Sequence, residues 1–163
     1  YALLTGPERV LVLGFPLNAR ARRLVMSRRP PSHSGYVAGE RIAGYLRAAH
    51  EAGFPPECID WLEVDDRFPE SAAASMAPLL GALPRGTRLA VLAMSDRVAL
   101  AARDELARWP GIERRALVGF DDGSSAADCG LTTVRQDARR RPVEHSGGNS
   151  ADRCLEPGRT SAR

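Results

Sequence analysis

The chain has no lysine, few cysteines and no long hydrophobic run. All 23 basic residues are arginine, which together with abundant alanine, glycine and proline suggests a GC-rich coding sequence. Cys58, Cys129 and Cys154 are widely spaced and form no C-x-x-C pattern, which argues against a disulfide framework and fits a reducing cytoplasm. The longest apolar run, residues 89–94, is strand-sized, whereas a membrane span needs roughly 20 apolar residues. We therefore expect no membrane partner.

Sequence motifs of the common enzyme classes are also missing. Residues 1–163 contain no G-x-S-x-G motif, no P-loop and no G-x-G-x-x-G after a predicted strand. His33, His50 and His145 have no acidic or cysteine partner at metal-ligand spacing, so we expect no metal and no other cofactor. An enzyme is the disfavoured class, and a small α/β enzyme would need a nucleophile or metal site that the sequence does not show.

Short apolar runs alternate with amphipathic stretches along the chain. The apolar runs that predict strands are residues 9–15, 59–64, 89–94 and 116–120. The stretches that predict helices are residues 36–51, residues 71–83, and a helix that opens at Ser95-Asp96 and ends at Pro110-Gly111. Strands that are apolar throughout and alternate with helices are typical of a parallel sheet covered on both faces. The sequence therefore predicts an α/β fold with a doubly wound parallel sheet.

Two stretches lack this pattern. Residues 138–163 consist of Arg, Ser, Gly, Pro and Glu with almost no apolar periodicity, so we expect a disordered tail. An out-of-frame or otherwise non-native ending would have the same composition. Residues 16–34 predict an Arg-rich and Pro-rich loop, which could bind phosphate but is more commonly solvated. The folded domain is therefore predicted to be residues 1–137.

Polar side chains directly follow two predicted strands. Asp121 and Asp122 come after the run LVGF, and ligands bind at the carboxyl ends of strands in open parallel sheets. Carboxylates there could accept hydrogen bonds from the hydroxyls of a sugar or nucleoside, although one of them could instead cap the following turn. Ser95 and Asp96 follow another strand, where both residue types are also preferred at the start of a helix.

Two further side chains could contact a ligand. Arg41 lies early in the first predicted helix, and its planar guanidinium suits a carboxylate, a phosphate or a vicinal hydroxyl pair. A solvent-exposed charge is the alternative for this residue. Phe68 lies in a strand-to-helix loop, where it could either stack on a ring-shaped ligand or pack against the protein.

Four short segments carry a family resemblance. They are GERIAGY (residues 39–45), AMSDRVA (93–99), VGFDD (118–122) and LTTVRQD (131–137). Respectively they resemble an R-x-x-G-[YFW] helix start, an [SN]-D-x-x-A strand-to-helix junction, V-G-[FY]-D-[DN] and L-T-T-[VI]-x-Q. In this order and spacing they resemble the effector-binding domain of the lactose-repressor/galactose-repressor family of bacterial transcription regulators. The resemblance extends from about residue 4 to residue 137.

This resemblance implies a periplasmic-binding-protein-like fold with two lobes, of which the chain is mainly the carboxyl-terminal lobe. It implies that Arg41 and Asp121 contact a small effector in the cleft between the lobes. Ser95 and Asp96 are the next implied contacts, and Phe68 is the implied aromatic wall. It further implies a homodimer that binds operator DNA through a helix-turn-helix domain, which residues 1–163 do not contain.

We therefore expect a cytoplasmic effector-sensing domain of a bacterial transcriptional regulator, a repressor. A sugar- or nucleoside-like molecule would bind to it and modulate operator binding. The alternative is a periplasmic sugar-binding protein of a transport system, because such proteins share the fold and much of the site chemistry.

Overall fold

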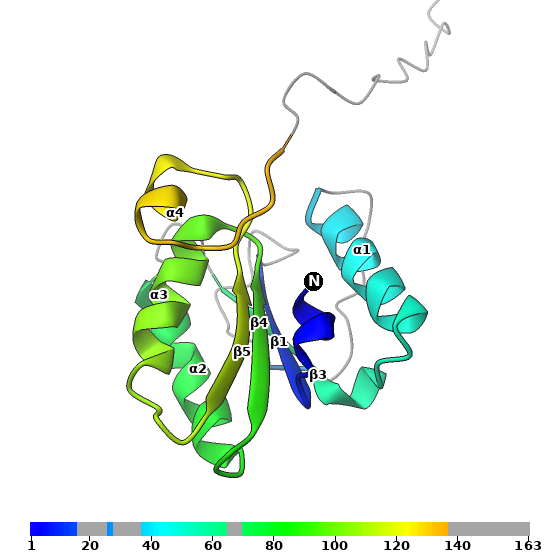
Figure 1. The fold of residues 1–163 in the computed structure, drawn as a ribbon, viewed down its shortest axis with the longest axis vertical. Coiled ribbons are helices and arrows are strands. Elements are labelled where there is room, and N and C mark those ends of the chain that lie inside the picture. Colours follow the sequence, from blue (N-terminus) through cyan, green and yellow to red (C-terminus); the bar gives the residue numbers. More distant parts are fainter. Residues whose placement is uncertain (16–25, 28–36, 65–69, 137–163) are drawn as a thin grey trace, which may run out of the picture.

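The computed structural model describes residues 1–15, 26–27, 37–64 and 70–136. These residues form one five-stranded sheet with the order β2-β3-β1-β4-β5 (Figure 1). The strands are β1 (Arg9–Gly14), β2 (Met26–Ser27), β3 (Ile59–Glu63), β4 (Arg88–Ala93) and β5 (Glu113–Val118). The helices are α1 (Val37–Glu51), α2 (Glu70–Ala82), α3 (Asp96–Leu106) and α4 (Ser124–Asp128), with 3₁₀ turns η1 (Ala2–Thr5) and η2 (Pro56–Cys58).

The four longer strands pair in parallel, with β1 in the interior of the sheet. Val12 on β1 lies opposite Trp61 on β3 and Leu92 on β4. Five of the six β1 residues are buried, as expected for a strand whose two faces are both covered. The predicted doubly wound parallel fold is thus confirmed, and β2 adds a short antiparallel edge next to β3.

Helices cover both faces of the sheet. Figure 1 shows α1 on one side and α2 with α3 on the other. On the α2 and α3 side the core includes Leu11, Leu13, Met76, Leu80, Val91 and Val98. On the α1 side it includes Val10, Val12, Ile42, Ile59, Trp61 and Met94. Successive residues of β1 after Arg9 therefore contribute to opposite cores, which explains why that part of the strand is apolar.

The strand order changes direction at β1. The chain passes from β1 through α1 to β3 on one side, then through α2 to β4 on the other side, and through α3 to β5. In open α/β sheets the crevice outside the carboxyl ends of the strands, at such a switch point, is the usual ligand site. The start of α1 and the carboxyl ends of β4 and β5 are therefore the expected location of a ligand site.

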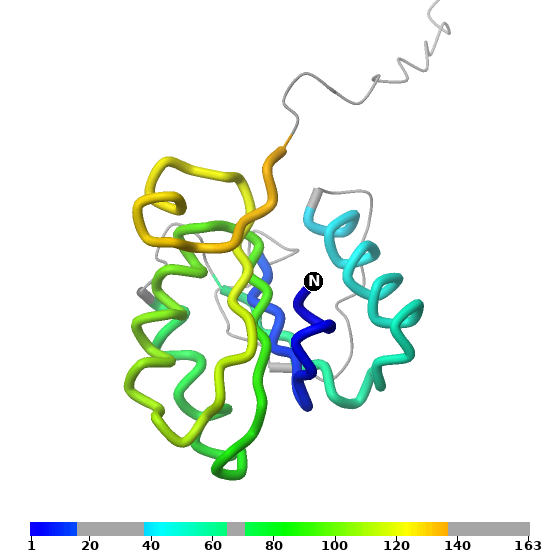
Figure 2. Tube along the Cα trace, viewed as in Figure 1, coloured from blue at the N-terminus to red at the C-terminus, as the bar shows by residue number. Residues whose placement is uncertain are grey.

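Residues 131–136, which we call the return segment, follow α4 and come back to the carboxyl end of β5. Figure 2 shows this segment, in orange, crossing beside the upper end of the sheet. The amide of Gly119 donates to the carbonyl of Thr132 at 2.8 Å, and the amide of Asp121 donates to the carbonyl of Val134 at 2.9 Å. The return segment therefore extends the sheet by a few residues just where the candidate site begins.

Some boundaries and elements differ from the prediction. Strand β5 begins at Glu113 rather than residue 116, because its first three residues are charged and exposed and gave no apolar signal. The family resemblance implies the end of a helix at residues 1–6, where the structure has the 3₁₀ turn η1, whereas β2, η2 and α4 were not predicted; β2 lies within the expected loop of residues 16–34. The rest of that loop, Phe68 and the expected tail of residues 138–163 lie outside the described residues.

No helix in the described part of the chain is long and apolar enough to cross a membrane.

Candidate functional site

Arg41 connects α1 to the carboxyl ends of β4 and β5. Its Nη1 donates to the carbonyl of Met94, at the end of β4, over 2.5 Å. Its guanidinium carbon lies 3.8 Å from the centroid of the Phe120 ring, just after β5, in a cation–π contact. The Arg41 side chain is only 11% exposed. Three parts of the fold therefore hold this positive charge at the switch point of the sheet.

The carboxylate of Asp121 faces the Arg41 guanidinium. Asp121 Oδ1 lies 3.5 Å from Arg41 Nη2 and also accepts a hydrogen bond of 2.5 Å from Gln136 Nε2. The Asp121 side chain is 46% exposed, so this ion pair has one largely buried and one solvent-accessible partner. The structure thus brings together the two residues that the sequence ranked first, and their contact with an effector stays a prediction.

Ser95 and Asp96 occupy the start of α3 and are both buried. Ser95 is the N-cap residue, and its Oγ accepts from the amide of Val98 at 3.3 Å. Asp96 Oδ2 accepts from the amide of Gly123 at 2.8 Å, and Oδ1 accepts from the hydroxyl of Thr133. The structure therefore gives Ser95 the capping role that the sequence allowed and gives the Asp96 carboxylate partners within the chain; their role toward an effector stays a prediction.

Asp121 and Asp122 both have a left-handed backbone, with φ values of 109° and 53°. Such values are uncommon for residues other than glycine, although aspartate tolerates them better than most. The amide of Asp122 donates to Thr133 Oγ1 at 3.2 Å, and the Asp122 carboxylate pairs with Arg135. Asp122 is therefore engaged with the return segment through its carboxylate and its amide, and the turn-capping role that the sequence offered as an alternative stays a prediction.

Phe120 and Gln136 belong to this site but were not singled out from the sequence. Both lie within the family-like segments, Phe120 directly before Asp121 and Gln136 near the end of LTTVRQD. Their positions in those segments were the available signal. An aromatic residue at the end of an apolar run is more readily interpreted as core, and nothing local shows that Gln136 returns to Asp121.

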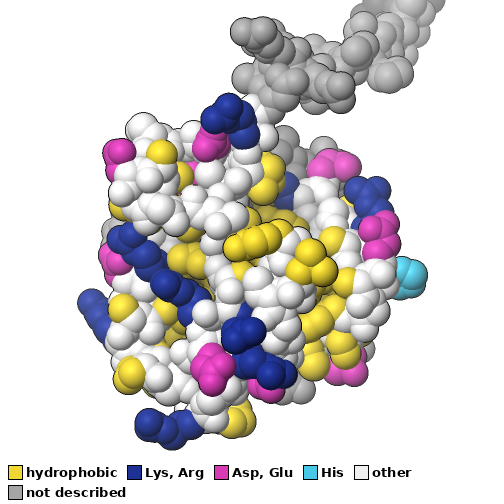
Figure 3. Space-filling view, viewed as in Figure 1, with side chains coloured by type: hydrophobic (Ala, Val, Ile, Leu, Met, Phe, Trp, Pro, Cys, Tyr) yellow, Lys and Arg dark blue, Asp and Glu magenta, His cyan; other side chains and the backbone are white. Residues whose placement is uncertain are grey.

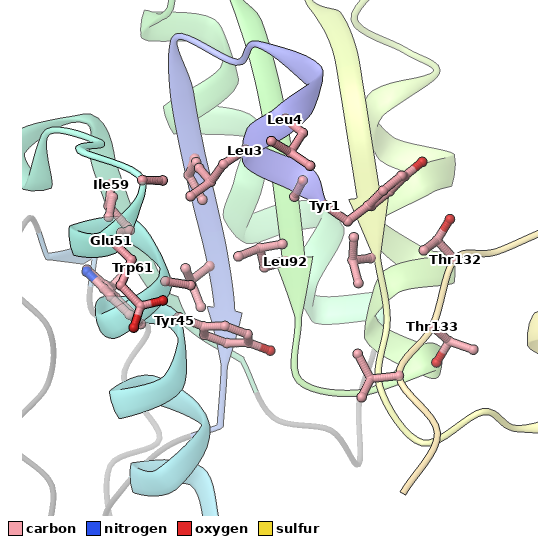
Figure 4. Close-up of a pocket in the computed structure, with 18 residues that line it drawn as sticks. Tyr1, Leu3, Leu4, Tyr45, Glu51, Ile59, Trp61, Leu92, Thr132 and Thr133 are labelled. Atoms are coloured by element: carbon pink, nitrogen blue, oxygen red, sulfur yellow. The ribbon is translucent and has the colours of Figure 1, made fainter.

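A separate apolar groove lies on the α1 side of the sheet. It has a volume of about 650 Å³ and lies between η1, α1 and the return segment (Figure 4). In the space-filling view, hydrophobic side chains gather in the middle of the face that is turned toward the reader (Figure 3). The residues that line the groove include Tyr1, Leu3, Tyr45, Trp61, Leu92 and Val134. The described residues of the predicted effector site are not among those lining it, but Thr133 and Val134, which bond to Asp96 and Asp121, are, so the groove adjoins the site.

Tyr45 links the two places electrostatically. Burial raises the pKa of Tyr45 above its ordinary value of 10.0, and the positive charge of Arg41 lowers it in part.

Among the described residues, no cluster of three or more histidine, cysteine, aspartate or glutamate side chains could hold a metal ion. The chemistry that this arrangement offers is binding, by a fixed guanidinium and a half-exposed carboxylate.

Known proteins resemble this chain in sequence and in structure. A family model of the periplasmic binding protein-like domain matches residues 14–141. The structure of a protein described as a LacI-family transcriptional regulator, from Sanguibacter keddieii, has 31% identity and a TM-score of 0.55, over 81% of this chain and 44% of that one. A LacI-family transcriptional regulator from Corynebacterium glutamicum has 25% identity and a TM-score of 0.63, over 83% and 40%. No curated protein sequence matches significantly.

A LacI-family regulatory protein from Chloroflexus aggregans, 23% identical with a TM-score of 0.60 over 84% of this chain and 44% of that one, supports the fold alone. The chain spans less than half the length of each of these three solved structures. The family match includes all four segments that carried the resemblance, and that resemblance is thereby confirmed. The chain therefore belongs to the family of periplasmic binding protein-like domains, in the form that LacI-family transcriptional regulators contain.

Proposed function

We propose that this chain senses a small effector for a bacterial DNA-binding transcriptional regulator, a repressor of the cytoplasm. The similarity to LacI-family regulators supports this assignment. The proposed regulator is a homodimer, and it binds the operator through a helix-turn-helix domain that lies outside residues 1–163. The sensing domain supplies the signal to which operator binding responds.

The observation that carries the proposal is the position of Arg41 and Asp121. The guanidinium is fixed against Met94 and Phe120, while nearly half of the Asp121 side chain meets solvent. Guanidinium donors beside a carboxylate acceptor match the adjacent hydroxyls of a sugar or nucleoside. We assign the effector to that class, with Ser95 and the predicted aromatic wall as further contacts.

Effector binding would change operator affinity by favouring one arrangement of the lobes over another. A ligand can do so only if it binds the two arrangements with unequal affinity, and couplings of this kind are typically about 1–3 kcal/mol. Asp121 and Arg41 lie at the edge of the sheet where a second lobe would close over the ligand. The pair would thus contribute to both affinity and closure.

Asp121→Ala tests the proposal in the whole regulator. Isothermal titration with D-ribose, D-galactose, D-glucose and adenosine would give the affinity, and operator-fragment anisotropy would give the response. Loss of a hydrogen bond to a charged group costs about 1.5–3 kcal/mol, so we expect affinity to fall roughly 10- to 150-fold. Asp128→Ala, an identical change at an exposed position on α4, is the control. An unchanged effector response in Asp121→Ala would refute the assignment.

The gene upstream of the Tyr1 codon separates this function from its main rival. A helix-turn-helix followed by a first lobe would support a regulator. A secretory signal without that motif would instead indicate an exported sugar-binding protein, and the transcriptional proposal would have to be withdrawn.

A further inference from the structure

Both carboxylate oxygens of Asp96 accept hydrogen bonds from other residues of the chain. The residue is 6% exposed. Its Oδ2 accepts from the amide of Gly123, its Oδ1 accepts from the hydroxyl of Thr133, and its own amide donates to the carbonyl of Phe120 at 2.9 Å. These contacts lie on both sides of Asp121 and Asp122 in the sequence, so one buried residue binds the turn at both of its ends.

The backbone at Gly119, just after β5, lies directly against the Asp96 carboxylate. A Cβ atom added at Gly119 would lie 2.2 Å from Asp96 Oδ1 and 3.2 Å from Asp96 Cα. Gly119 is buried and donates its amide to the return segment. The absence of a side chain at Gly119 is therefore what allows Asp96 to approach the backbone of the turn.

The turn itself has a conformation that needs support. Asp121 and Asp122 both have positive φ, and backbone of this kind persists where surrounding contacts hold it. Thr133 provides one such contact, because its hydroxyl donates to Asp96 and accepts from the amide of Asp122. The chain Asp96–Thr133–Asp122 thus connects the start of α3 to the backbone beside Asp121.

We propose that Asp96 is a positioning residue that acts through Asp121, with Thr133 as its link, and does not itself contact the effector. It fixes the backbone of residues 120–123, which directs the Asp121 carboxylate toward Arg41. Its effect on effector binding rests on the proposed function, whereas its effect on the geometry of the Arg41–Asp121 pair does not. This assigns Asp96 a different role from the one that the family resemblance implied.

Thr133→Val tests the link, because it keeps the shape of the side chain and removes the hydroxyl. The amide of Asp121 donates to Val134 and does not contact that hydroxyl, so its hydrogen exchange reports on the turn as a whole. We expect this amide to exchange at least tenfold faster, and the side-chain ¹⁵N–¹H signal of Arg41, assigned with Arg41→Lys, to shift. Thr133→Ser should restore both, and Thr132→Val, the same change one residue earlier, should alter neither.

Unchanged Asp121 exchange together with an unchanged Arg41 signal in Thr133→Val would overturn the proposal. Should that variant fail to fold, Asp96→Asn gives the same test, because a side-chain amide has one acceptor oxygen and can accept from Gly123 or from Thr133 but not from both. Weaker binding of the sugar and adenosine probes by Asp96→Asn, with both NMR signals unchanged, would make Asp96 a direct contact and also overturn it. These measurements need no effector for their first readout, so they can fail or succeed independently of the Asp121→Ala test.

Discussion

Gly119→Ala should destabilise the fold strongly although it adds only one methyl group. The new Cβ would lie 2.2 Å from Asp96 Oδ1 and 3.0 Å from Leu131 Cδ2, and separations below 3.0 Å essentially never occur for real Cβ atoms. The carboxylate cannot rotate away freely, because Thr133 and Gly123 hold both of its oxygens. Either the end of β5 or the start of α3 must move.

The size of the effect follows from two contributions. Overpacking a well-packed interior costs typically about 1–3 kcal/mol, and leaving a buried hydrogen-bonding group without its partner costs about 1–3 kcal/mol. The two overlap, because movement of Asp96 relieves the clash while it breaks the hydrogen bonds. We therefore expect a loss of about 2–4 kcal/mol in the free energy of unfolding, built from these two ranges. For a chain of this size that corresponds to a decrease in Tm of roughly 5–15 °C.

Urea denaturation followed by circular dichroism, with calorimetry as a second measure, would test this value. Gly44→Ala is the matched control, because Gly44 lies inside α1 and an added Cβ meets no atom within 4 Å. Alanine in place of glycine within a helix stabilises by roughly 0.5–1 kcal/mol. If Gly119→Ala unfolds at the same urea concentration as the unsubstituted chain, Asp96 does not pack against this strand as described.

Three further perturbations have defined outcomes. Asp60→Asn removes the buried carboxylate paired with Arg9 and should lower the free energy of unfolding by about 2–4 kcal/mol in the same urea assay. Glu8→Gln, at an exposed ion pair, should lower it by less than about 1 kcal/mol. The pKa of Tyr45 is raised on folding, so the stability that the neutral phenol contributes is present below pH 10.0 and lost as pH rises through the higher folded pKa. Absorbance titration should show the raised pKa, and Arg41→Ala should raise it further, because the positive charge of Arg41 lowers it. Ser95→Ala removes the α3 cap and should cost about 1 kcal/mol by thermal denaturation; equal stability would contradict the capping role.

The strands were predictable because burial on both faces makes each of them apolar along most of its length. Residues 10–13 show the pattern most clearly, since they contribute alternately to the two cores. The first half of β5 escaped prediction because Glu113, Arg114 and Arg115 are exposed. Helix α4 escaped because five residues with only Ala126 buried are too few to show a helical period.

The site was predictable in its residues more than in its connections. Arg41 and Asp121 were found from strand ends and family-like segments, but the cation–π contact of Arg41 with Phe120 depends on how α1 lies against the end of β5. The close approach of Asp96 to Gly119 joins residues that follow different strands through the register of the sheet. No local pattern encodes a distance of that kind.

The return segment also affects how the sheet meets other molecules. β5 is the last strand of the sheet, and an unpaired strand edge is a ready template for a strand from another chain. Along the first half of that edge, Glu113, Arg114 and Arg115 are charged and exposed, which disfavours such pairing. At the end of that edge, Thr132 of the return segment bridges to Val118, the last residue of β5, in parallel. The segment that orders the turn at Asp121 thus also covers the end of this edge against edge-to-edge aggregation, so a change that detaches it would reduce solubility.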